Sequence, residues 1–145
     1  MGSRKFFTVA MIALTLSGCA ASRSTVDLSV APISQHSDAK AYVKLLAVAD
    51  QRKYEINPRD PSIPSLGNAA QIEDRAITSR ALARKRNSWG MALSDIMLPE
   101  GRTVEQVVRE AVTKALMDKG YALVEPGDVH YATASPLKVD IQKFW

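Results

Sequence analysis

The only thiol in the chain belongs to Cys19, which directly follows the small residues Ser17 and Gly18. A lone cysteine cannot close a disulfide within the chain, so its chemistry lies elsewhere. Small residues immediately before a cysteine form a lipobox, in which the thiol receives a diacylglycerol before the preceding peptide is cleaved. We therefore expect Cys19 to be the lipidated first residue of the mature protein.

The residues before this thiol have the order of a secretory signal. Arg4 and Lys5 supply a positive start, and residues 6–16 form a short apolar run. That run is too short for a membrane-spanning helix, which needs roughly 20 apolar residues. We expect residues 1–18 to be a lipoprotein signal peptide; the plainer interpretation is a signal peptide with an incidental cysteine.

Composition restricts the possible partners. The formal net charge of +4 falls by two when Arg4 and Lys5 leave with the signal, so the mature chain is nearly balanced. Nucleic-acid binding requires a clustered basic footprint, which this balance does not favour. We expect no nucleic-acid partner, no metal and no cofactor. The membrane is the expected partner, reached through the lipid on Cys19.

Two charged residues end the first apolar strand, Asp50 and Arg52. Open α/β sheets often bind ligands at the carboxyl ends of their strands, so this pair is a candidate ligand-binding edge. The plainer interpretation is a surface ion pair, which contributes under about 1 kcal/mol.

The densest basic segment contains Arg80 and, closer together, Arg84, Lys85 and Arg86. Arginine forms paired hydrogen bonds to phosphate, so these three adjacent residues are candidates for binding lipid headgroups or a phosphorylated polymer. The plainer interpretation is a solvated charged face, because lipid recognition usually involves four to eight basic residues beside the anchor.

Sequence signals for catalysis are weak. His36 and His130 are far apart and flanked by turn-type residues, which predicts two solvated loop histidines rather than metal ligands. The chain contains neither a Gly-x-Ser-x-Gly turn nor a phosphate-binding Gly-x-x-x-x-Gly-Lys loop. Ser88 and Ser94 have no positioned base in the sequence. We expect no enzyme activity.

Patterning divides the mature chain into a tether and one domain. Residues 19–40 are rich in Ser, Ala and Thr and read as a flexible tether, interrupted by a short half-buried strand where apolar residues alternate at 26–30. Residues 41–145 are expected to form a single α+β domain. Its four strands, in one mixed sheet, are predicted at residues 42–50, 89–98, 121–125 and 137–143.

Proline and glycine predict a long loop over residues 53–68, directly after the first strand. That strand is nearly all apolar, which favours burial on both of its faces. Residues 69–87 remain open between helix and extended chain, because a rough helical periodicity competes with an Ala-Leu-Ala-Arg-Lys-Arg run.

The clearest element is an amphipathic helix over residues 104–119. Thr103 and Gln106 have the spacing of a capping box, and valines recur at helical spacing behind them. The helix is expected to cover one face of the sheet, with Val108 and Val112 at the centre of the contact.

The chain stops at Phe144 and Trp145, two bulky aromatics with nothing after them to bury them. We expect the domain to be incomplete at its C-terminus.

The order of these elements resembles the YajG-type bacterial envelope lipoproteins. The lipobox, a buried strand that ends in Asp-x-Arg at Asp50, a loop, a helix and then Gly-Tyr at Tyr121 carry the resemblance. It implies a lipoprotein of the cell envelope without assigned catalytic residues. Because Ala20 rather than Asp follows Cys19, the resemblance also implies the outer membrane of a Gram-negative host, with the domain facing the periplasm.

Two classes of function follow from these observations. The preferred one is a membrane-anchored, non-enzymatic binding or structural module, which contacts an envelope protein or polymer through the 53–68 loop and nearby strand edges. The alternative is a lipid-handling accessory protein or an envelope hydrolase, with Asp50 and Asp95 as its carboxylates. A catalytic pair must approach to about 5–10 Å, so their placement discriminates between the two classes.

Overall fold

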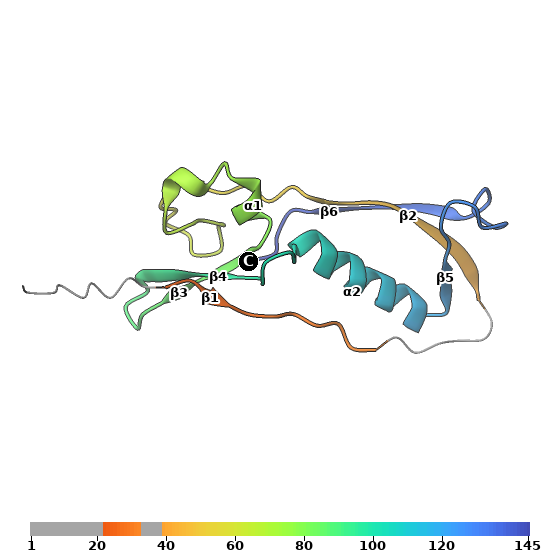
Figure 1. Ribbon diagram of the computed structural model, residues 1–145, viewed down its shortest axis with the longest axis horizontal. Helices are drawn as coiled ribbons and strands as arrows, with labels where there is room; N and C mark the ends of the chain where they lie inside the picture. Colours follow the sequence, from red (N-terminus) through yellow and green to blue (C-terminus); the bar gives the residue numbers. More distant parts are fainter. Residues whose placement is uncertain (1–21, 33–38) are drawn as a thin grey trace, which may run out of the picture.

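The structure, a computed structural model, describes residues 22–32 and 39–145. Cys19, the expected signal peptide and His36 lie outside these ranges. The described part is an elongated α+β domain, with two three-stranded sheets and one long helix (Figure 1). The predicted fold class is confirmed. The expectation of one sheet is wrong, because the strands divide into two sheets. Within the described ranges, none of the helices has the length and apolar character needed to cross a membrane.

The first sheet is parallel throughout. Its central strand β2 (Ala41–Asp50) lies between β5 (Tyr121–Leu123) and β6 (Ser135–Ile141). A register shift between Leu45 and Ala47 interrupts its pairing with β6. Leu46 lies at this irregularity and is exposed, so the expectation that β2 is buried on both faces is wrong at this position.

The strand predicted at residues 89–98 lies in the second sheet and not beside β2. β4 (Ala92–Met97) is its central strand, antiparallel to β3 (Ala81–Arg86) and parallel to the short β1 (Ser24–Thr25). The basic segment is thus extended. The alternating strand expected at 26–30 is replaced by β1, just before it.

Two short helical turns precede β3 in the region that the sequence left open. They are the 3-10 turn η1 (Ala69–Gln71) and the helix α1 (Arg75–Thr78). The side chain of Asn68 caps η1, and that of Asp74 caps α1. Residues 69–87 therefore contain both of the alternatives, helical turns first and then a strand.

The long helix α2 (Val104–Asp118) begins at the predicted capping box, where Thr103 and Gln106 exchange both hydrogen bonds. Its contact with the core is centred one turn earlier than expected. Val104 and Val107 are buried, whereas Val108 is only partly buried against the same cluster and Val112 is partly exposed.

Truncation of the helix contacts should reveal this shift. We expect Val104→Ala to lower the free energy of unfolding by about 1–3 kcal/mol, because its methyl groups are fully buried. Val112→Ala removes the same atoms from a partly exposed site and should cost well under that. Urea unfolding followed by circular dichroism measures both changes. A larger loss for Val112→Ala would show that the helix packs through the other turn.

One hydrophobic core joins both sheets to the helix. It contains Val48, Leu82, Leu98, Val104, Val107 and Ile141. A smaller cluster, formed by Leu66, Ala81 and Met97, lies under the 53–68 loop. Phe144 packs against the first cluster and Trp145 against the second, so the premise that nothing buries these aromatics is wrong. The expectation that the protein continues beyond Trp145 remains a prediction.

Candidate functional site

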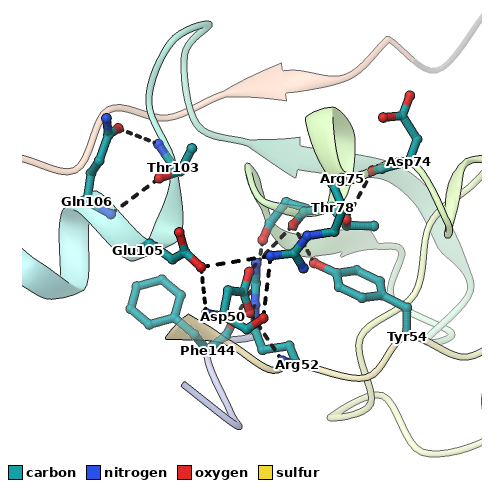
Figure 2. A network of polar contacts seen from close by, with 11 residues as sticks. Asp50, Arg52, Tyr54, Asp74, Arg75, Thr78, Thr103, Glu105, Gln106 and Phe144 are labelled. Atoms are coloured by element: carbon teal, nitrogen blue, oxygen red, sulfur yellow. Dashed lines mark hydrogen bonds and ion pairs between the residues drawn. The ribbon is translucent and has the colours of Figure 1, made fainter. Parts of the chain in front are cut away.

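Asp50 and Arg52 form a buried ion pair where β2 ends. Neither side chain has exposed surface, and the guanidinium engages the carboxylate through two bonds (Figure 2). Arg52 Nε donates to one oxygen at 2.8 Å, and Nη2 donates to the other at 2.7 Å. Such paired geometry makes the strongest class of charge-assisted hydrogen bond.

The remaining N–H groups of the guanidinium donate to backbone carbonyls. Arg52 Nη1 donates to the carbonyls of Ala81 at 2.7 Å and Phe144 at 3.0 Å, and Nη2 donates to that of Thr78 at 2.9 Å. With the two bonds to Asp50, all five N–H groups of the guanidinium are used. Arg52 therefore connects β2 with α1, β3 and the C-terminal segment, which are distant in sequence.

This arrangement overturns both interpretations of the pair that the sequence offered. Asp50 and Arg52 do not form a surface ion pair, and with every donor of Arg52 used they do not present a free binding edge. The guanidinium donates to three backbone carbonyls, so the pair satisfies polar groups that the fold would otherwise leave unpaired.

Two further groups extend the network to its neighbours. The hydroxyl of Tyr54 donates to the carbonyl of Thr78 at 2.9 Å, and burial raises the pKa of Tyr54 to about 12, which keeps this donor protonated. On the other side, Glu105 Oε1 accepts from the backbone N–H of Asp50 at 2.7 Å. Glu105 lies in the first turn of α2, so the helix and β2 are joined at this point (Figure 2).

Asp95, in β4, forms a second buried charge cluster. Arg23 Nε donates to one of its oxygens at 3.2 Å, and Arg84 Nε lies 3.5 Å from the other. The backbone N–H of Gly67 also donates to the carboxylate at 2.8 Å. Asp95 thus holds the end of the 53–68 loop and the segment before β1 against the sheet.

The two carboxylates expected of a hydrolase therefore have separate roles. Asp50 is paired with Arg52 at the end of β2, whereas Asp95 is paired with Arg23 and Arg84 in the other sheet. Each carboxylate thus has its own arginine partners: Arg52 for Asp50, and Arg23 with Arg84 for Asp95.

The basic residues of β3 have different environments, because one is turned inward and two are exposed. Arg84 turns inward to Asp95 and is mostly buried, so it does not share the surface with its two basic neighbours. Lys85 and Arg86 are exposed, and Arg86 Nη1 donates to the carbonyl of Gly90 at 2.8 Å. Two basic residues thus remain on the surface near the end of the β3–β4 hairpin.

His130 also differs from the expectation of a solvated loop residue. Its ring stacks on that of Tyr42, with the centroids 3.8 Å apart and the planes 9° from parallel. Among the residues that the structure describes, no group of three or more His, Cys, Asp or Glu side chains is placed to hold a metal ion.

A groove of about 580 Å³ lies between the 53–68 loop and the segment that follows β6. Its lining comprises Gln51, Lys53, Glu55, Asp60, Ser62, Ile63, Pro64, Gln142 and Lys143. The loop was predicted from its prolines, but Gln142 and Lys143 were missed. Because β2 and β6 are parallel neighbours, their carboxyl ends meet at one edge, which is the signal that would have placed these residues beside the loop.

The groove is charged in both signs. Lys53 and Lys143 supply cations, while Glu55 and Asp60 supply carboxylates. The backbone N–H of Ser62 donates to Asp60 at 2.8 Å and lowers the pKa of that carboxyl, which keeps it ionised. This lining suits a polar ligand with groups of both charges.

Comparison of the chain with known protein families, with curated proteins and with solved structures finds no match.

Proposed function

We propose that this protein is a membrane-anchored lipoprotein of the cell envelope, which acts as a non-enzymatic binding module at the periplasmic side of the outer membrane. Cys19 carries the lipid, and the groove between the 53–68 loop and Lys143 binds an envelope protein or polymer. The order of the signal residues and the resemblance to YajG-type lipoproteins support the anchor.

The observation that carries the binding role is an alternation of side chains along residues 50–55. Asp50 and Arg52 are buried and Tyr54 is half-buried, and these three form the internal network. The residues between them, Gln51, Lys53 and Glu55, are exposed and line the groove. Every second residue thus fixes the backbone, while its neighbours are presented to solvent.

Fixing the backbone in this way favours binding. A ligand that meets an ordered segment does not bear the entropy of ordering it, which is the usual advantage of a preorganised surface. The lipid anchor adds to this, because a tethered domain meets envelope partners at raised effective concentration. The mixed charges favour a protein or polar polymer over an acyl chain, which would need an apolar lining.

Photo-crosslinking in cells tests the groove directly. A photo-reactive amino acid in place of Ser62, which is exposed in the groove, should give a discrete adduct on irradiation. The same amino acid in place of Lys138, exposed on β6 outside the groove, provides the positional control. Equal adducts from both positions would count against the groove as the interface.

Charge reversal then tests which groups make the contact. Lys53→Glu with Lys143→Glu should abolish the Ser62 adduct, because both cations line the groove. The matched control, Arg109→Glu with Lys138→Glu, changes the same charge at two exposed sites outside the groove and should leave the adduct intact. If the Ser62 adduct still formed in the groove variant, the groove would not be the binding interface.

A further inference from the structure

Three exposed large apolar side chains gather at the tip of the β3–β4 hairpin. Trp89, Met91 and Leu93 have exposed fractions of 82%, 59% and 51%. Met91 directly precedes β4, and Leu93 lies at the register shift where Arg86 pairs with Ala92 and Lys85 with Ser94. An exposed tryptophan beside two further apolar residues marks an interaction site.

The turn that presents Trp89 is held by hydrogen bonds. The Asn87 side-chain oxygen accepts from the backbone N–H groups of Trp89 at 3.1 Å and Met91 at 2.9 Å. Gly90 takes the positive φ of 79° that the turn requires, and Arg86 donates to its carbonyl. The indole is thus displayed from an ordered turn.

Strand topology places this tip at the end of the second sheet from which β1 starts. β1 runs parallel to β4 with Ser24 opposite Ile96, so the chain preceding β1 leads toward the end of the sheet where β4 starts. In Figure 1 the start of β1 and the β3–β4 turn lie at the same end of the molecule. The ion pair between Arg23 and Asp95 fixes this register.

The chain from β1 back to Cys19 and the strand from Ile96 back to the hairpin tip have similar lengths. Ser24 lies five positions after Cys19, and an extended chain of that length spans at most about 18 Å. Ile96 likewise lies five positions after Met91 at the hairpin tip, a strand length of about 17 Å. The chain before β1 is therefore long enough for a lipid on Cys19 to reach the plane of the exposed Trp89 indole without deforming the described fold.

Charge and side-chain chemistry then identify the occupant of that plane. Lys85 and Arg86 are exposed on β3 next to the tip, where they suit anionic phosphate headgroups. Tryptophan favours the membrane–water interface, where its ring is partly apolar and its N–H stays hydrated. We propose that the tip formed by Trp89, Met91 and Leu93 seats in the headgroup layer of the membrane that holds the Cys19 lipid. This inference rests on the proposed anchor, and it fixes the orientation of the domain at the membrane.

Depth-dependent quenching of tryptophan fluorescence tests the contact. The chain has two tryptophans, so Trp145→Phe leaves Trp89 as the only reporter. The protein is purified from the membrane fraction and reconstituted in vesicles of phosphatidylethanolamine and phosphatidylglycerol. Because interfacial side chains lie about 5–10 Å into the headgroup boundary, lipids brominated near the glycerol should quench Trp89 emission by about half. The complementary variant Trp89→Phe, in which Trp145 reports, should show no quenching.

Mass spectrometry of the same sample separates this proposal from the anchor. Unquenched Trp89 in a protein that carries acyl chains on Cys19 would overturn the hairpin contact and leave the anchor intact. A protein without acyl chains would overturn the anchor, and quenching by added vesicles would still decide the hairpin contact. A shift of Trp89 emission that depends on protein concentration, without quenching, would assign the tip to contact between copies and overturn the proposal.

Discussion

Replacement of Arg52 by methionine is expected to lower the free energy of unfolding by about 3–5 kcal/mol, the cost of breaking a buried ion pair by removing one partner. The substitution leaves the Asp50 carboxylate buried and uncompensated. It also removes the donors to the carbonyls of Thr78, Ala81 and Phe144. Arg52→Lys should lose much of the same stability, because an ammonium cannot reproduce the planar five-donor fork. Urea unfolding followed by circular dichroism gives the values.

Arg59→Met is the matched control for this experiment. Arg59 is exposed in the 53–68 loop that follows Arg52. Its replacement should therefore change the free energy of unfolding by less than about 0.5 kcal/mol. If Arg52→Met lowered the free energy of unfolding by under about 1 kcal/mol, the pair would contribute no more than a surface ion pair does. Asp50→Leu combined with Arg52→Met should recover part of the loss, because it removes the orphaned charge as well.

The sequence predicts best the features that depend on neighbouring residues. The capping box at Thr103, the helix that follows it and the loop after β2 are all set by local chemistry, and the structure confirms them. The basic segment at Arg84 stayed ambiguous because its alanines favour helix, while its extended form depends on pairing with β4. Pairing between distant strands also decides that the strands form two sheets.

Burial of Asp50 and Arg52 could not be predicted from the same local evidence. A charged pair after a strand is usually solvated, and here it is buried because three carbonyls distant in sequence meet at the guanidinium. The groove presents the same difficulty, since Lys143 joins Lys53 only through the parallel pairing of β6 with β2. The alternation of inward and outward residues after Asp50 was the available signal, and the polar character of Arg52 obscured it.

The second large effect concerns the anchor. Cys19→Ser removes the only thiol of the chain, and with it the atom to which a diacylglycerol could be attached. We expect the variant to stay unprocessed or to leave the membrane fraction. Fractionation and the apparent mass of the protein report both outcomes. A variant that is cleaved and membrane-bound like the wild type would place the anchor in another part of the chain.

Incorporation of labelled palmitate in cells is the most direct measurement of the central claim, that Cys19 holds this domain at a membrane. We expect the wild type to be labelled and Cys19→Ser to remain unlabelled. Adding Ser22→Cys to that variant supplies a thiol three residues beyond the lipobox and should not restore the label. Equal labelling of Cys19→Ser and the wild type would contradict the claim, and with it the proposal of a lipid-anchored envelope module.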